Sequence, residues 1–246
     1  VLGDSLLPIQ LGVGVSGGCE AAVHAARRLL AEMPDDWTLV KIDFSNAFNC
    51  LRRDTMLGAV ADRIPQLYKF CHLAYSQSSV LWFGEHILTS EEGAQQGDPL
   101  GPLLFCLSIH PLLMSLGSPL RLAYMDDVTL AGPSDTVFSD VASIRQLGMA
   151  YGLHVNDSKS EVIVLSSTGK DNYAGFVQLT PDTSTLLGAP LDRGSAMDDC
   201  LVRHCENLER AIDRLQLLAA NDALVLLKNS LSAPRLLFTL RAAHCS

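Results

Sequence analysis

The sequence has 246 residues, of which 48% are hydrophobic and 18% are charged, and this composition excludes a disordered chain. Its length allows one large domain or two subdomains that share a core. The formal net charge of −9 lacks the basic character typical of nucleic-acid-binding proteins, although a local basic groove can lie on an acidic protein. Because the chain starts at Val1 rather than Met, we expect a fragment of a longer protein.

Seven cysteines are scattered along the chain without a CxxC pair. They predict reduced, mostly buried thiols in an intracellular protein rather than a disulfide framework or a zinc site. Residues 99–120 contain no formally charged residue and are long enough to span a bilayer. Because Pro111, Gly117 and Pro119 interrupt this stretch, we interpret it as a buried core helix. We expect no signal peptide.

The first half of the chain predicts short strands and helices in alternation. In chain order we expect a strand at 37–44, a turn at 45–50, a helix that Asp54 caps and that ends near residue 64, a second helix at 67–75, a hairpin at 78–90 that turns near Gly84 and Glu85, and a glycine- and proline-rich loop at 91–102. The apolar core helix follows this loop.

The second half begins with another hairpin, whose expected strands are 121–125 (RLAYM) and 128–132 (VTLAG). We then expect a helix from about 134 to 151, a strand at 161–166 and a short strand at 185–191. Between residues 201 and 219, apolar residues recur at spacings of four and three, which predicts a seam packed within a helical subdomain. Strands first and helices after predict an α+β fold, an antiparallel sheet with helices on one face.

Asp126 and Asp127 lie side by side between apolar residues at the tip of this second hairpin (AYMDDVTL, 123–130). Aspartate is an ordinary turn residue, so a plain turn explains the pair equally well. A third acid, Asp43, ends the expected strand at 37–44, where a helix cap is the alternative. If the two strands pair in one sheet, Asp43 and Asp126 can meet at the same end.

Two carboxylates about 4 Å apart repel each other by roughly 4 kcal/mol at an effective dielectric constant of about 20. A divalent cation removes this penalty, and ligands that are all oxygen suit Mg²⁺. Two such ions about 3.5–4 Å apart can clamp the attacking and leaving oxygens of a phosphoryl displacement. Because successive strand residues point to opposite faces, Asp126 is the safer ligand and Asp127 depends on the turn.

Several segments together resemble reverse transcriptases. The segments YMDD (124–127), KIDFSNAF (41–48) and QGDPLGP (96–102) have the order and spacing of the palm motifs of this family. The segment QGDPLGPLLF is most similar to the corresponding segment of non-LTR (LINE-type) retrotransposon enzymes. Three more segments resemble a finger segment, a lysine-bearing motif and the primer-grip strand, namely PIQLGVGVSGGCEAAVHA (8–25), GLHVNDSKSEV (152–162) and TLLGAPL (185–191). The resemblance covers residues 8 to 245.

The resemblance implies a role for each matching position. Asp43, Asp126 and Asp127 would be the catalytic, metal-binding triad for Mg²⁺, for which Mn²⁺ can substitute. Lys159 would act near the departing pyrophosphate as a charge or a proton donor, where a solvated surface lysine is the alternative. Phe48 would be the steric gate that rejects a 2′-hydroxyl and selects dNTP over rNTP, where plain core packing is the alternative.

Other matching positions would contact the substrate or the primer. Those that line the nucleotide site would be the backbone carbonyl of Phe44, Gln96, Gly97, Tyr124 and Met125. For Gln96 and Gly97, a loop before a helix is an equally natural local explanation. Leu187 and Gly188 would support the primer end.

The resemblance also implies a division of the chain as in a right-hand polymerase. We expect partial fingers at 1–36, palm with the first catalytic strand at 37–50, fingers and palm helices with a hairpin at 51–92, palm at 93–195 and the start of a helical thumb at 196–246. The upstream finger segment that grips the triphosphate is expected to be absent.

The function that the resemblance implies is an RNA-directed DNA polymerase core from a retrotransposon-type polyprotein. Its partners would be an RNA template, a DNA primer and dNTP, without a membrane, in an intracellular and nuclear location. A truncated, non-catalytic remnant that folds and binds nucleic acid is the alternative, which the net charge of −9 favours. An RNA-dependent RNA polymerase shares the palm, but Phe48 and YMDD rather than GDD argue against it. The sequence indicates no oligomeric state.

Overall fold

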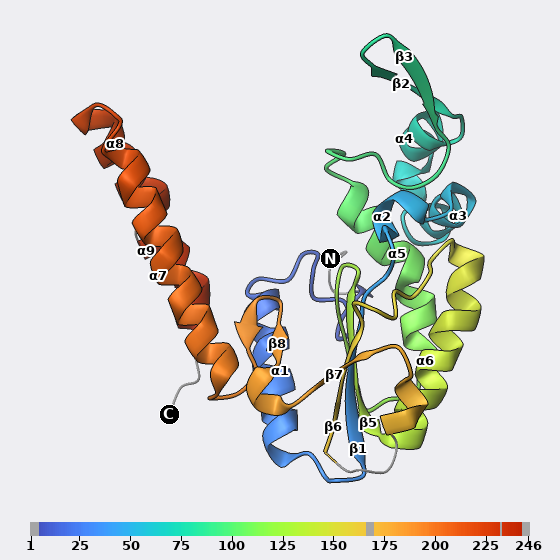
Figure 1. Cartoon of the computed structure of the whole chain (residues 1–246). Helices are drawn as coiled ribbons and strands as arrows, with labels where there is room; N and C mark the ends of the chain where they lie inside the picture. The colour runs from blue at the N-terminus through green and yellow to red at the C-terminus, as the bar shows by residue number, and fades with distance from the viewer. Residues whose placement is uncertain (1–4, 166–169, 232, 243–246) are drawn as a thin grey trace. The chain divides into compact units, whose positions relative to one another are not determined.

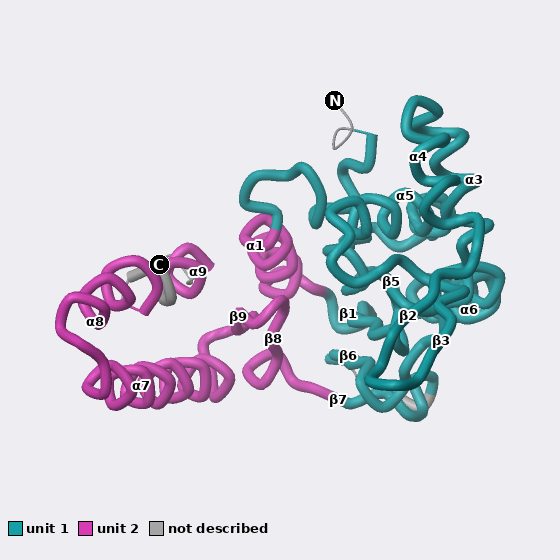
Figure 2. Tube along the Cα trace, turned by 90° about the horizontal axis from the view of Figure 1, so that it is seen from above, with its two compact units in different colours: residues 1–18, 34–178 teal, residues 19–33, 179–246 magenta. Residues whose placement is uncertain are grey.

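A sheet with covering helices and a mainly helical part make up the chain (Figure 1). They belong to two compact units, which Figure 2 colours separately. The first unit comprises residues 1–18 and 34–178, and the second comprises residues 19–33 and 179–246. The computed structural model describes residues 5–165, 170–231 and 233–242.

Five strands form the sheet of the first unit, in the order β4-β5-β1-β6-β7. Their bounds are Trp37–Ile42 (β1), Leu120–Tyr124 (β4), Asp127–Pro133 (β5), Glu161–Val164 (β6) and Val177–Leu179 (β7). The central strand β1 pairs antiparallel with both β5 and β6, and β4 pairs antiparallel with β5. These pairings confirm the predicted antiparallel sheet.

The burial of strand β1 agrees with its central place in the sheet. Leu39, Val40 and Ile42 are all buried, as β-branched and apolar residues of a central strand are expected to be. Val40 and Ile42 share one core with residues of α5 (Gly101–Met114) and α6 (Ser134–Gly148). Helix α6 packs on β1 and β5, so helices cover this face and the α+β class is confirmed.

Helices α3 (Arg53–Arg63) and α4 (Pro65–Tyr75) pack together, and α3 also packs on α5. Pro65 separates the two helices because proline fits the first turn of a helix and disfavours a helical residue before it. A separate hairpin follows, built from β2 (Ser79–Phe83) and β3 (His86–Ser90), with the predicted turn between them.

The predicted turn at 45–50 contains a short helix, α2 (Ala47–Cys50). Asn46 adopts a left-handed conformation with a φ of 53°, which lets the chain leave β1 and enter this helix at once. The prediction that Asp54 caps the next helix was wrong. Helix α3 begins at Arg53, one residue before Asp54, and its N-cap is Arg52. Asp54 instead accepts hydrogen bonds from Arg52 and from the Thr55 N–H.

Helix α5 confirms the predicted buried core helix, since ten of its fourteen residues are buried. Of the residues that the structure describes, none belong to a helix long and apolar enough to cross a membrane. Six cysteines lie in the described part of the chain and are free, but only Cys71, Cys106 and Cys200 are buried. The seventh, Cys245, lies outside the described residues.

The second unit combines helices with a small hairpin. Its elements are α1 (Gly18–Glu32), β8 (Thr185–Leu186), β9 (Ala189–Pro190), α7 (Ser195–Leu215), α8 (Ala220–Leu226), a π-helical turn at Leu227–Leu231 and α9 (Ala233–Arg241). The buried Arg27 of α1 links these parts, because its guanidinium donates to the carbonyl oxygens of Pro190, at 3.0 Å from Nε, and of Ala242.

Two predictions for the second half of the chain need correction. The single strand expected at 185–191 is a tight hairpin, because Leu187 and Gly188 have φ values of 49° and 82° and form its turn. The strand expected at 161–166 ends at Val164, and Ser166 lies outside the described residues.

The predicted seam of α7 is only partly right. Leu201 and Ile212 of that seam are about half exposed, whereas the buried residues of α7 are Ala196 and Cys200. Periodicity gives the apolar face of a helix but not which part of that face a neighbour covers. The assignment of segments to fingers, palm and thumb stays a prediction.

Asp140 of α6 fixes the loop that leads into β4. Its buried carboxylate accepts hydrogen bonds from the N–H groups of Gly117 and Ser118, at 2.9 and 2.7 Å, and from the Ser118 hydroxyl. A buried carboxylate is stable when such donors surround it, and here they anchor the strand that carries the YMDD segment.

Replacing Asp140 with alanine is expected to lower the free energy of unfolding by about 3 kcal/mol, because buried N–H groups lose a charged acceptor. Urea unfolding followed by circular dichroism measures the change. Asp135→Ala, at an exposed position in the first turn of the same helix, is the matched control and should cost less than about 1 kcal/mol. Equal losses in the two variants would contradict the anchoring role.

Candidate active site

The register of the central ladder sets the position of the first acid. Strands β1 and β5 pair antiparallel as far as Ile42 and Val128. One step further along this register lie Asp43, directly after β1, and Asp127, the first residue of β5. The two acids therefore come to the same end of the sheet.

The β4–β5 hairpin sets the position of the other acids. Tyr124 pairs with Asp127 across this hairpin, which leaves Met125 and Asp126 as a turn of two residues. Asp126 is half-buried and Asp127 is exposed. Asp43 and Asp126 were expected to meet if their strands pair in one sheet, and β1 and β5 do pair.

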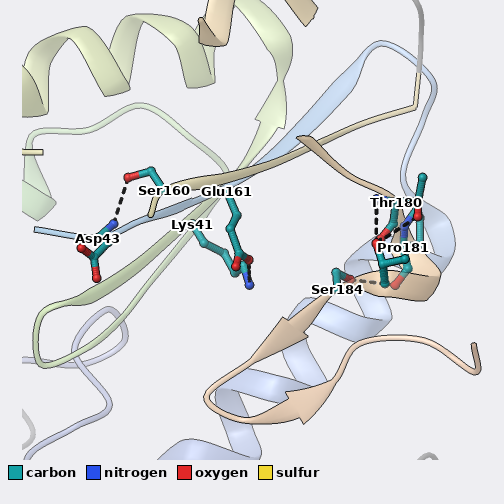
Figure 3. A network of polar contacts seen from close by, with 8 residues as sticks. Lys41, Asp43, Ser160, Glu161, Thr180, Pro181 and Ser184 are labelled. Carbon is teal, nitrogen blue, oxygen red and sulfur yellow. Dashed lines mark hydrogen bonds and ion pairs between the residues drawn. The ribbon is translucent and has the colours of Figure 1, made fainter. Parts of the chain in front are cut away.

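The backbone of Asp43 is held on both sides of its α-carbon. Its N–H donates to the Ser160 hydroxyl at 3.1 Å (Figure 3). Its carbonyl oxygen accepts from the Asn156 N–H at 2.8 Å. Ser160 in turn donates to the Asn156 carbonyl oxygen at 2.8 Å. Sequence reasoning missed Ser160 and Asn156, because the contacts join Asp43 to a segment more than a hundred residues away.

Burial and mutual repulsion shape the electrostatics of the acids. Burial, and then the charge of Asp43, raise the pKa of Asp126 above its usual range. Although Asp127 as a whole residue is exposed, its carboxyl group is partly shielded from water by surrounding atoms. This desolvation, followed by the charges of Asp126 and Asp43, raises the pKa of Asp127, and Lys41 offsets only part of the effect. Lys41 itself forms an ion pair with Glu161 on β6 (Figure 3).

The three carboxylates fit a divalent cation by their chemistry, since they are hard oxygen donors whose repulsion such an ion would relieve. In the parts of the chain that the structure describes, no three His, Cys, Asp or Glu side chains are already grouped closely enough to hold a metal. The metal-binding role of Asp43, Asp126 and Asp127 thus stays a prediction, which their location at one end of the sheet and the raised pKa values of Asp126 and Asp127 support.

Phe48 lies on α2, and its half-buried ring stacks on Phe105 of α5 with centroids 4.5 Å apart and an angle of 21° between the planes. The stacking favours this orientation of the ring plane. Phe44 is buried in the core through its side chain, so its backbone is the part of the residue left for a ligand. The substrate contacts of both residues stay predictions.

The loop with Gln96 and Gly97 is exposed but anchored at its base. Gly97 has a φ of 91°, which favours glycine, and open space surrounds its α-carbon. The Tyr75 hydroxyl donates to the Asp98 carboxylate and accepts from the Gln95 N–H at 3.3 Å. Burial and this carboxylate raise the pKa of Tyr75 to about 12, so the hydroxyl keeps the proton that it donates.

Arg53 of α3 supports the start of the same loop. Its buried guanidinium donates to the carbonyl oxygens of Gly93 and Ser90, at 3.1 and 2.8 Å, and lies 5.4 Å from the centre of the Tyr75 ring. An arginine in the first turn of a helix gives no sign of this role in the sequence, so Arg53 and Tyr75 were not predicted.

Lys159 lies in a turn between Asn156 and Ser160, the two residues that hold Asp43. Its side chain is exposed and its N–H donates to the Asn156 carbonyl oxygen at 3.2 Å. Leu187 and Gly188, by contrast, belong to the second compact unit. Their predicted contact with a primer, like the pyrophosphate contact of Lys159, stays a prediction.

The sheet is antiparallel and has helices on one face. One acid lies in a hairpin turn, the next begins the following strand, and a third comes directly after the neighbouring strand, which is the arrangement of a polymerase palm. Residues 10–191 match the model of the family described as reverse transcriptase (RNA-dependent DNA polymerase). The chain belongs to this family.

A known protein of similar sequence agrees with this assignment. The chain is 30% identical over 181 residues to the retrotransposable element SLACS 132 kDa protein of Trypanosoma brucei gambiense. The alignment covers 69% of this chain and 15% of that protein. The predicted resemblance to reverse transcriptases of the non-LTR retrotransposon type is confirmed.

Solved structures show the same fold. Telomerase from Candida albicans, in complex with the TWJ fragment of telomeric RNA, superposes with a TM-score of 0.52 at 15% identity, over 72% of this chain and 33% of that chain. Telomerase from Candida tropicalis, with the same kind of RNA fragment, gives a TM-score of 0.50 at 14% identity, over 90% and 44% of the two chains. At these identities the likeness supports the palm fold alone.

In metal-free protein at pH 7, Asp126→Asn is expected to raise the melting temperature by about 2–4 °C, the shift that about 1 kcal/mol gives in a chain of this size. The raised pKa means that the carboxyl group stabilises the fold below the usual aspartate pKa, and that this contribution is lost as the pH rises through the raised value. The gain should therefore vanish near pH 3.5. Scanning fluorimetry in EDTA across this range measures it.

Asp62→Asn, at an exposed position of α3, is the matched control and should not change the melting temperature. Adding Mg²⁺ should stabilise the wild type and leave the Asp126→Asn protein nearly unchanged. A destabilised Asp126→Asn protein at pH 7 without metal would contradict the electrostatic account.

Proposed function

We propose that this chain is the RNA-directed DNA polymerase core of a retrotransposon polyprotein. It joins the 3′-hydroxyl of a DNA primer to the α-phosphate of a dNTP that an RNA template selects, and pyrophosphate leaves. The observation that carries the proposal is the convergence of Asp43, Asp126 and Asp127 at one end of the sheet, in a chain of the reverse transcriptase family.

Mg²⁺, or Mn²⁺ in its place, supplies when bound the positive charge that stabilises the attacking and leaving oxygens of the phosphoryl transfer. The chain contributes mainly position. Hydrogen bonds from Ser160 and Asn156 hold the backbone of Asp43 at the end of β1, and the hairpin presents Asp126 and Asp127 beside it. The exposed ammonium group of Lys159 is free to approach the pyrophosphate as it leaves.

Selection between dNTP and rNTP is assigned to Phe48. A side chain can reject a hydroxyl group by collision only if it does not move aside. Its stacking on Phe105, a residue of the fully buried part of α5, supports this role because it holds the ring in place. The dNTP contacts of Gln96, Gly97 and Tyr124 belong to the same proposal.

The proposed nucleic-acid partners are an RNA template and a DNA primer. With a net charge of −9, the whole-chain field repels phosphates, so binding has to rely on local groups. An intracellular, nuclear location is part of the proposal and rests on family resemblance.

The first test is primer extension on poly(rA) primed with oligo(dT), with dTTP and either Mg²⁺ or Mn²⁺. The wild type is expected to extend the primer, and Asp126→Asn to lose about 10³-fold or more in rate, because the variant removes a charged group that acts in the transition state. Asp62→Asn is the matched control and should extend as the wild type does.

Extension by Asp126→Asn at the wild-type rate would overturn the catalytic role of the acid. If the wild type binds the primer–template but does not extend it, and binding is indifferent to Mg²⁺, the non-catalytic alternative is favoured. Restoring the residues that precede this segment in its polyprotein then decides between an incomplete polymerase and an inactive one.

Phe48→Ala is expected to reduce the preference for dTTP over UTP, measured as the ratio of kcat/KM values on the same template, by about tenfold or more. Phe70→Ala is the matched control, since Phe70 is 61% exposed on α4 and should leave the ratio unchanged. The melting temperature of both variants separates a loss of selectivity from a loss of folding. An unchanged ratio in a folded Phe48→Ala protein would show that Phe48 is a packing residue.

A further inference from the structure

The segment just before α1 adds to the edge of the sheet beside β4. Gln10 pairs in parallel with Ala123, two residues before the turn that carries Asp126. The Leu11 N–H donates to the Ala123 carbonyl oxygen at 2.7 Å, and the Ala123 N–H donates to that of Ile9 at 2.8 Å. The backbone of this segment is thereby fixed next to the hairpin tip.

The side-chain amide of Gln10 bonds both backbone polar groups of Met125. Its oxygen Oε1 accepts from the Met125 N–H at 2.7 Å, and its nitrogen Nε2 donates to the Met125 carbonyl oxygen at 3.1 Å. Gln10 is fully buried and Met125 is half-buried, so the two bonds are partly shielded from competition with water. A glutamine side chain supplies this donor and acceptor pair in the same way as a strand backbone would.

Met125 has a conformation that needs such support. Its φ of 59° is one that residues other than glycine rarely adopt, and in a two-residue hairpin turn this position usually holds glycine. Strained residues of this kind persist only where surrounding contacts enforce them, and they cluster at functional sites. Asp126 and Asp127 follow directly.

Gly12 completes the contact from the same segment. A β-carbon at Gly12 would lie 2.7 Å from the Met125 nitrogen and 2.8 Å from the Met125 Cγ. Glycine at this position is therefore required for the segment to approach the turn so closely. Gln10 supplies the hydrogen bonds and Gly12 supplies the space.

We propose that Gln10 is a positioning residue, which holds the turn at Met125 so that Asp126 and Asp127 are presented for metal binding. The inference rests on the proposed function for its consequence, but not for the hydrogen bonds themselves. An amide is suited to the task because it is neutral, whereas a charged side chain at this position would add to the field that already acts on Asp126. Residues that orient metal ligands from behind typically change metal affinity by about 10–100-fold when they are replaced.

The experiment compares the wild type with Gln10→Met, which keeps the length of the side chain and removes both hydrogen bonds. Hydrogen–deuterium exchange of peptides that span 123–128, in EDTA, reports on the turn. The concentration of free Mn²⁺, read from its electron paramagnetic resonance signal during titration, reports on the acids. Gln146→Met, at an exposed position on α6, is the matched control.

Gln10→Met is expected to speed exchange in these peptides about tenfold and to weaken Mn²⁺ binding about tenfold, whereas Gln146→Met should match the wild type. An unchanged exchange rate or an unchanged Mn²⁺ affinity in folded Gln10→Met would overturn the proposal. If the wild type binds no Mn²⁺, the proposed function is what fails, and the exchange rate alone then decides whether Gln10 holds the turn.

Replacement of Met125 by glycine separates positioning from packing. Glycine adopts a positive φ readily, so a turn with Met125→Gly depends less on support from Gln10. In this background Gln10→Met should weaken Mn²⁺ binding by about threefold at most. An equal loss in both backgrounds would show that Gln10 acts by filling space, and would overturn the positioning role. If Gln10→Met does not fold, Gln10→Asn keeps an amide that is too short to reach both groups and carries the same tests.

Discussion

The main constraint on the first unit is that three acids of like charge lie at one end of its sheet. Burial, and then the charge of Asp43, disfavour the ionised forms of Asp126 and Asp127, so the pKa values of these two hairpin acids are raised. Nothing in the acids themselves favours such an arrangement, so the surrounding fold has to enforce it. The register of β1 and β5 and a set of hydrogen bonds to the backbone do so, while the carboxylates themselves stay available.

Helix α5 supports the same site through its buried residues. It lies within residues 99–120, which carry no formal charge, and most of its own residues are buried. Phe105 of this helix stacks on Phe48. Burial, and then the charge of Asp126, raise the pKa of the next residue, Cys106, to about 12. Lys41 offsets only part of the raised pKa of Asp127, so a bound divalent cation would relieve the repulsion that remains.

Much of the first unit could be predicted because its signals are local. Alternating and β-branched residues showed the strands, and the place of Asp43 at the end of one strand, with Asp126 at the tip of a hairpin, showed the acids. The contact of Gln10 with Met125 could not be predicted, since 115 residues separate the partners and a glutamine has many ordinary uses. The helix α2 and the β8–β9 hairpin were missed because single residues, Asn46 and Leu187, adopt left-handed conformations that their types do not announce.

The central position of β1 has a consequence for how such a chain can change over time. Side chains alternate along a strand, so the loss or gain of one residue within β1 would turn Val40 and Ile42 away from the core and move Asp43 to the opposite face. The packing of the core and the position of Asp43 in the site would then be lost together. A one-residue insertion in β1 is therefore expected to be far more costly than one in the exposed turn at Gly84 and Glu85, where a β-carbon added at Gly84 would meet nothing within 4 Å.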